Sequence, residues 1–164
     1  MNFQVGERVV YPPEGGGTIR EIVEREVLGS LQKYLKVDFV RGDMTLLVPL
    51  DSALQVGLRR TLDSDGFQRL REHAETLLDL PEQWPARHRT EQQILERCDA
   101  FELSRLIATL SVRDQERGLA DTEREILETA RALLASELAI VRGTDLGDAE
   151  RWIDTELLGD GPAV

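Results

Sequence analysis

Apolar and polar positions follow two different periods along this chain, and the change falls near residue 60. In the first part, Leu35, Val37 and Phe39 alternate with the polar residues Lys36 and Asp38. This period of two is typical of a strand that buries one face. We therefore predict that the first part of the chain forms a β-sheet.

Turn-forming residues divide this region into four or five short strands. Further β-rich runs cover residues 5–11, 18–28 and 44–48. We expect turns at Gly15-Gly16-Gly17 and at Arg41-Gly42-Asp43, because glycine clusters between apolar runs favour turns. Short strands with tight turns predict a small Tudor- or SH3-like β-barrel, which usually leaves an edge strand open.

From about residue 61 the apolar period becomes helical. The longest apolar stripe, with the spacing of one helical face, comprises Ile126, Leu127, Ala130, Leu133, Leu134, Leu138 and Val141. Helix breaks are expected at Pro81–Pro85, near Asp99, at Gly118 and at Gly143. Thr122, followed by Glu125, predicts a capping box at the start of the longest helix. The pattern indicates a compact all-α module of about five helices.

The predicted fold class is therefore α+β, with a barrel module over residues 1–58 and a helical module over residues 62–164. A hydrophobic content of 41% with 31% charged residues is typical of a globular protein. No signal peptide is visible after Met1 and no run of about 18 apolar residues occurs, so we expect a cytoplasmic protein without membrane association. The single cysteine fits a reducing compartment.

The net charge of −11 is carried by the second part of the chain, because residues 1–60 hold eight basic and eight acidic side chains. A strongly negative surface repels nucleic acid at long range. Any contact with DNA must therefore be local, weak on its own, or delivered by a tether.

Trp84 is the most informative residue. It precedes Pro85 and the cationic run Arg87-His88-Arg89. Pro85 favours extended backbone at Trp84 and suits the first position of a helix, so Trp84 is expected to project from a helix N-terminus, where free amides can meet a phosphate. On these residues alone, two other interpretations stay open: a tryptophan packed into the core, and arginines that are merely solvated.

Other candidate residues give weaker signals. Arg113 and Arg117 lie four apart before Gly118 and could reach phosphate, although internal ion pairs with Asp114 or Glu116 are equally consistent. Cys98 is expected to be a core thiol. We find no metal-ligand spacing, no cofactor or nucleotide motif and no arrangement of catalytic side chains, so no enzyme, metal or cofactor is predicted.

An ordered set of short motifs resembles the CarD/CdnL family of bacterial transcription regulators over nearly the whole chain. The matching positions are Phe3-x-Val-Gly-x-x-Val-Val-Tyr-Pro12, Gly15, Tyr34, Gly42-Asp43-x-Thr45, Val48-Pro49, Trp84-x-x-Arg87-x-Arg89 and Arg113-Asp-Gln-Glu-Arg-Gly-Leu119. No single motif decides the resemblance, but their order is specific.

The resemblance implies a monomeric, nucleoid-associated partner of RNA polymerase. Its Tudor-like module would dock on the β subunit by strand addition, through Arg25, Glu26, Val27 and Leu28; Leu47 stands where some relatives carry arginine. Its helical module would touch promoter DNA near the upstream edge of the −10 element, where the tryptophan enters the minor groove and stabilises the open complex. The implied DNA-contacting residues are Trp84, Arg87, His88, Arg89, Arg113 and Arg117.

An alternative hypothesis remains. The acidic second part also fits a protein-only adaptor, in which the barrel binds a partner strand and the helices dock a second protein without touching DNA. Exposure of Trp84 is the feature that distinguishes the two hypotheses.

Overall fold

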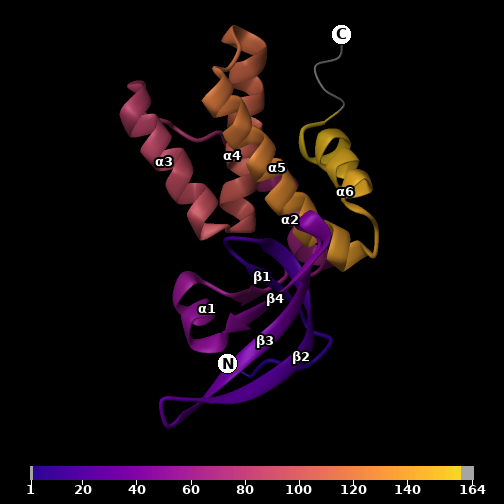
Figure 1. Ribbon diagram of the computed structural model, residues 1–164. Coiled ribbons are helices and arrows are strands. Elements are labelled where there is room, and N and C mark those ends of the chain that lie inside the picture. The colour runs from indigo at the N-terminus through magenta and orange to yellow at the C-terminus, as the bar shows by residue number, and fades with distance from the viewer. Residues whose placement is uncertain (1, 160–164) are drawn as a thin grey trace.

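The computed structural model describes residues 2–159 and has the predicted α+β class. Figure 1 shows an antiparallel sheet with one short helix at one end of the molecule and a group of helices at the other end. The long helix α5 (Asp121–Arg142) extends from the far end of the helical group down to the sheet.

The sheet contains five antiparallel strands in the order β4-β3-β2-β1-β5. The predicted alternation is confirmed, because Leu35, Val37 and Phe39 are all buried on one face of β3. The turn predicted at Arg41–Asp43 is confirmed as a short 3-10 turn. The strands are β1 (Arg8–Tyr11), β2 (Gly15–Val27), β3 (Ser30–Phe39), β4 (Met44–Pro49) and β5 (Arg59–Arg60).

The glycine turn predicted at Gly15–Gly17 is wrong. These glycines begin β2 and pair with β1, and the turn lies instead at residues 12–14. A Cβ atom on Gly16 would lie 2.7 Å from the backbone oxygen of Ser136, and one on Gly17 would lie 2.6 Å from a methyl group of Val37. Glycine is used here for close approach between layers rather than for a turn.

A short helix, α1 (Leu50–Val56), lies between β4 and β5 and was not predicted from the sequence. It begins directly after Pro49, which has extended backbone, and ends at Gly57, whose φ of 105° is readily accessible only to glycine. Ala53 faces the sheet core, and the helix is too short for its apolar period to stand out.

Within the described residues five α-helices follow the sheet, as predicted, and the expected breaks fall between them. The predicted capping box is wrong, because α5 begins at Asp121 with Ala120 as its N-cap, so Thr122 already lies inside the helix. Asp121 and Glu123 place carboxylates in its first turn, where the helix dipole favours them. The helices are α2 (Ser64–Ala74), α3 (Trp84–Arg97), α4 (Ala100–Arg117), α5 and α6 (Leu146–Trp152), followed by a π-helical turn over Ile153–Leu157.

Two hydrophobic cores form, one within the sheet module and one among the helices. Val10 of β1 belongs to the helical core, so the two cores are in contact through the sheet. The division at residues 58–62 stays a prediction; it falls on β5, which pairs with β1. Residues 160–164 of the predicted helical module lie outside the described residues.

Candidate nucleic-acid interface and docking edge

Trp84 is the first residue of α3, and Pro85 is the second. The expected extended backbone occurs one residue earlier, at Gln83, which has φ −74° and ψ 129°. Proline is acceptable at the second helical position because the first amides of a helix have no intrahelical acceptor. The predicted register was therefore off by one residue, but Trp84 does lie at the N-terminus of a helix.

The indole of Trp84 is 36% exposed and rests on its own helix. Its ring centroid lies 4.9 Å from that of His88 and 5.1 Å from the guanidinium carbon of Arg87. A cation at this distance from an indole is attracted by the ring quadrupole. One part of the ring is thus fixed by neighbours while the remainder faces solvent.

The structure places Arg87 differently from the expected outward position. Arg87 is only 7% exposed, and its Nε donates to Oε2 of Glu123 at 2.9 Å. One terminal nitrogen also donates to the backbone oxygen of Glu82 at 2.6 Å. These donors are occupied within the protein, because the start of α5 and the loop before α3 both surround the guanidinium. Arg87 therefore supports Trp84 and is not presented to a phosphate.

Arg87 belongs to a largely buried group of four ionisable side chains with Glu91, Arg113 and Glu123. Nε of Arg87 lies 3.7 Å from Glu91, and Nε of Arg113 lies 3.4 Å from Glu123. Arg113 thus forms an internal ion pair, although its partner is Glu123 rather than Asp114 or Glu116. The group joins α3, α4 and α5 beneath Trp84.

Burial and the nearby Glu123 carboxylate raise the pKa of Glu91 to about 8. The carboxyl is fully buried, and neither oxygen has a hydrogen-bond partner within residues 2–159. Burial also acts to raise the pKa of Glu123, but its contacts with Glu91 and Arg87 and the charges of Arg87 and Arg113 hold it below the ordinary value. At neutral pH the group therefore holds a neutral Glu91 beside an ionised Glu123.

The remaining predicted cations are more accessible. Arg89 and Arg117 are exposed, and neither forms an ion pair within the part of the chain that the structure describes. His88 is half-buried against Trp84, and its Nδ1 is buried without a partner in the same part of the chain. Helix α3 begins and α4 ends at the end of the helical group that is farthest from the sheet (Figure 1).

The segment predicted to dock on polymerase lies on an open sheet edge. β1 pairs with β2 only over Gly15–Thr18, whereas β3 continues along β2 to Val27. β4 pairs with β3 only from Tyr34 onward. Residues 20–33 therefore form a two-stranded ribbon that projects from the sheet away from the helices (Figure 1). Arg25, Glu26 and Val27 lie near its end, where the outer backbone groups are unpaired in the described structure.

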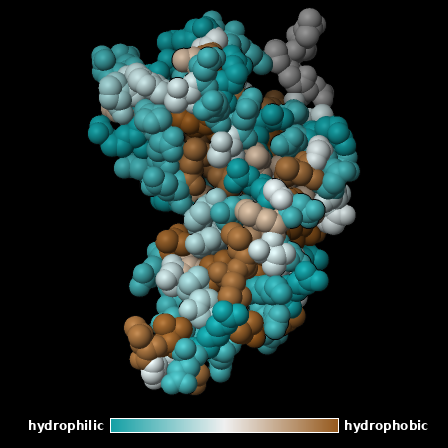
Figure 2. Space-filling model, in the orientation of Figure 1, coloured by the Kyte–Doolittle hydropathy of each residue, from teal (hydrophilic) through white to brown (hydrophobic). Residues whose placement is uncertain are grey.

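The turn of this ribbon is apolar. Leu28 is fully exposed and has a φ of 52°, and Leu31 is 74% exposed. Figure 2 shows hydrophobic atoms gathered at the end of the ribbon, at the lower left. Sequence reasoning missed Leu31, which continues the alternation of Leu35 and Val37 but lies beyond the sheet core.

The structure does not bring Leu47 to this segment. Leu47 is 38% exposed on β4, where it pairs with Lys36, and β3 separates β4 from β2. The predicted docking residues thus fall on two different edges of the sheet.

Comparison with known proteins decides the family. Residues 3–62 match the model of the CarD-like/TRCF RID domain, and residues 67–154 match that of the CarD C-terminal domain.

The chain belongs to the CarD family. This CarD family member is 27% identical over 144 residues to a putative transcription factor, YdeB, of Bacillus subtilis (strain 168), a match that covers 86% of this chain and 93% of the relative. The matches support a role in transcription regulation and an interaction with RNA polymerase. None of the helices within residues 2–159 has the length and apolar character needed to cross a membrane.

Proposed function

We propose that this CarD family member docks on the β subunit of RNA polymerase and stabilises the open promoter complex. Trp84 would enter the minor groove at the upstream edge of the bubble, near the −10 element. The protein would act as a monomer at the bacterial nucleoid, in the cytoplasm, and would catalyse no reaction. Its working parts would be the two modules, residues 1–58 and 62–164.

The open edge of the ribbon supports the docking half of the proposal. Unpaired backbone groups beside Arg25, Glu26 and Val27 are suited to strand addition. The exposed side chains of Leu28 and Leu31 add an apolar contact at the end of the same ribbon. Leu47, on the far edge, would contribute only if the partner also reaches β4.

The partly exposed, supported indole of Trp84 carries the DNA half of the proposal. An apolar wedge between base steps requires a few kcal/mol of unstacking, which is smallest where the duplex is already distorted. A ring held by Arg87 and His88 loses little rotational freedom on insertion. His88 flanks the wedge, while Arg89 and Arg117 are the accessible cations for adjacent phosphates.

The overall charge of −11 favours a role that depends on tethering. A chain so acidic is repelled by free DNA, but binding to polymerase raises the local concentration of DNA around Trp84. We therefore expect weak binding to promoter DNA alone and a measurable effect only in the polymerase complex. Little sequence readout is expected, because phosphate and wedge contacts carry little base information.

Open-complex dissociation kinetics test this proposal. Polymerase and promoter DNA are mixed with the wild-type protein or with Trp84→Ala, and the open complex is challenged with a competitor. The wild-type protein should lengthen the lifetime, and Trp84→Ala should lose this gain while still binding polymerase. Leu77→Ala is a matched control, because Leu77 is 43% exposed and lines a pocket with Ala74 and Leu157 that does not include Trp84. An unchanged lifetime with Trp84→Ala would contradict the wedge.

The acidic second part of the chain also favours the adaptor hypothesis, in which the helices bind protein rather than DNA. A photo-crosslinking amino acid in place of Trp84 distinguishes the adaptor hypothesis from the wedge hypothesis. Crosslinks from position 84 to promoter DNA in the polymerase complex support the wedge, and crosslinks to protein alone support the adaptor.

A further inference from the structure

Helix α5 connects the sheet module to the surface around Trp84. Near its start, Glu123 accepts a hydrogen bond from Arg87 and lies beside Arg113. Near its end, Ser136 and Glu137 contact the sheet module. At 1.5 Å per residue, these two ends are separated by about 21 Å of continuous helix. One rigid element therefore joins the predicted DNA surface to the module that carries the docking edge.

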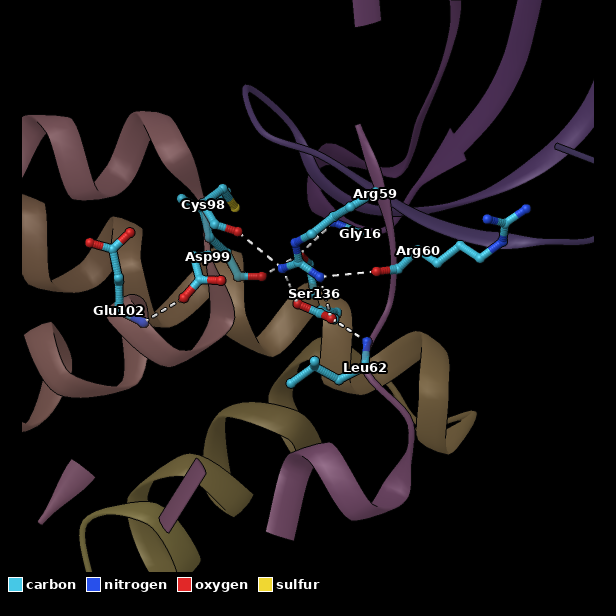
Figure 3. Close-up of polar contacts among 10 residues, drawn as sticks. Gly16, Arg59, Arg60, Leu62, Cys98, Asp99, Glu102 and Ser136 are labelled. Atoms are coloured by element: carbon cyan, nitrogen blue, oxygen red, sulfur yellow. Dashed lines mark hydrogen bonds and ion pairs between the residues drawn. The ribbon is translucent and has the colours of Figure 1, made fainter. Parts of the chain in front are cut away.

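The contact between α5 and the sheet centres on a partly buried ion pair, in which Glu137 is buried and Arg59 is half-buried. The guanidinium of Arg59 on β5 donates to the two carboxylate oxygens of Glu137 at 2.7 and 2.9 Å. It also donates to the backbone oxygen of Cys98, between α3 and α4, at 3.0 Å. The amide of Leu62 donates to Glu137 at 2.7 Å. Figure 3 shows these bonds converging from the sheet, α5 and the α3–α4 connection.

A glycine sets the separation of the two modules. The amide of Gly16 donates to Oγ of Ser136 at 2.9 Å. A Cβ atom on Gly16 would lie 2.7 Å from the backbone oxygen of Ser136 and 2.9 Å from the amide nitrogen of Glu137. Because backbone atoms cannot rotate away as a side chain can, any larger residue at position 16 must push α5 from the sheet. We call Gly16, Arg59, Ser136 and Glu137 the junction.

Buried charge in this protein is concentrated at the two ends of α5. Among residues 2–159, the buried charged residues are Arg87, Glu91, Glu123 and Glu137, all of which lie in the junction or in the group beneath Trp84. Buried ion pairs add little net stability compared with apolar packing, but they impose a defined geometry on the groups that they join. Their positions therefore point to a requirement for orientation.

We infer that Gly16, Arg59 and Glu137 are positioning residues, which fix α5 against the sheet and thereby set where Trp84 lies relative to the docking edge. This inference rests on the proposed function, since the required orientation is that of a polymerase-bound module toward DNA. In this role the three residues would contact neither DNA nor polymerase. They act through the angle between the modules.

Spin-label distance measurements on the full-length protein test the orientation. Labels are attached through Asp51→Cys on α1 and Gln93→Cys on α3, both of which are exposed. Cys98 is buried, and burial raises the pKa of its thiol to about 11, so it should stay unlabelled. Gly16→Ala should broaden or shift the distance distribution. Gly147→Ala is the matched control, because a Cβ there meets only ordinary contacts, of 3.5 Å to Asp145 and 3.7 Å to Arg151.

Arg59→Lys provides a second variant in case Gly16→Ala fails to fold. Lysine keeps the charge but cannot donate to both Glu137 oxygens and to Cys98 in one fixed geometry. It should therefore loosen the same distance distribution while circular dichroism shows both modules folded.

Open-complex lifetimes with the same variants complete the test. We expect a changed distance distribution together with loss of the lifetime gain, while polymerase binding is unchanged. Unchanged distances in both variants, or changed distances with a full lifetime gain, would overturn the inference. If the wild-type protein itself gives no lifetime gain, the proposed function fails, and the orientation claim is then judged by the distances alone.

Discussion

The guanidinium of Arg87 lies 5.1 Å from the centre of the Trp84 indole and is bound at the same time to Glu123 of α5. Arg87, which was expected to contact DNA, therefore supports Trp84, which is expected to enter the minor groove. This relationship makes Trp84 dependent on a buried ion pair rather than on its own backbone alone.

We predict that Arg87→Gln destabilises the protein by up to about 3–5 kcal/mol, because it removes the closer of the two cations that face the buried carboxylate of Glu123 and leaves only Arg113. The loss should appear as a lower midpoint in urea denaturation monitored by circular dichroism. Arg89→Gln, at an exposed position two residues away, should change the free energy of unfolding by no more than about 0.5 kcal/mol. Equal midpoints for the two variants would argue against the supporting role of Arg87.

Glu91→Gln should alter how stability depends on pH. The pKa of Glu91 is raised to about 8 in the folded state, whereas a carboxyl in the unfolded chain titrates near 4.3. As pH rises between these values the unfolded state loses its proton first, so Glu91 stabilises the fold at low pH and this contribution is lost on approach to pH 8.

Glutamine mimics the neutral form, so the variant should gain stability over the wild type as pH rises from about 5 to 8, by an amount on the order of 1–4 kcal/mol. Glu123, whose pKa is lowered, instead loses its stabilising contribution as pH falls below about 5. It should therefore not mask this difference between pH values of about 5 and 8. Urea midpoints at several pH values provide the measurement. The exposed Glu116→Gln serves as control, and a pH-independent gap between Glu91→Gln and wild type would be the contrary result.

Leu28→Asn should weaken polymerase binding without weakening the fold. Leu28 is fully exposed in left-handed backbone, a conformation that asparagine tolerates better than leucine. We expect an unchanged or raised melting temperature and a roughly tenfold loss of affinity for polymerase, equivalent to about 1.4 kcal/mol. Val56→Asn, which removes a 48% exposed apolar side chain from α1, is the control. Full affinity in Leu28→Asn would exclude the ribbon turn from the interface.

Arg89→Gln and Arg117→Gln should each reduce the salt dependence of the open-complex lifetime gain. Each exposed cation that meets a phosphate contributes about one unit to the slope of log affinity against log salt concentration. Lifetimes measured over a range of potassium chloride concentrations give this slope. Arg87 is buried and is not expected to contact phosphate. Slopes equal to that of the wild type in both variants would therefore mean that residues other than Arg89 and Arg117 contact the phosphates.

Regular, periodic features were the ones that the sequence could predict. The alternation around Val37 and the stripe around Leu134 identified a buried strand and a buried helix face because each depends only on local spacing. The start of α5 was misjudged at Thr122, because the helix already begins at Asp121 and its first turn carries Glu123, the partner of Arg87. Long-range partners of this kind leave no local signal.

The glycine run and Arg87 were misjudged for the same reason. The run Gly15-Gly16-Gly17 has the composition of a turn, but the role of Gly16 is set by its contact with Ser136, which is 120 positions away. Arg87 lies in a cationic run beside Trp84, but its environment is set by Glu123 and by the carbonyl of Glu82. The position of Trp84 at a helix start was predictable because proline restricts backbone locally.

The projecting ribbon also has a consequence for the protein when it is alone in solution. Two unpaired strand edges that end in Leu28 and Leu31 form a template on which a second ribbon could add, which is the usual route to edge-to-edge aggregation. The exposed charges of Glu24, Arg25 and Lys33 along those strands oppose such self-pairing. Neutralising them should make the purified protein cloud on concentration, even though no buried contact has been altered.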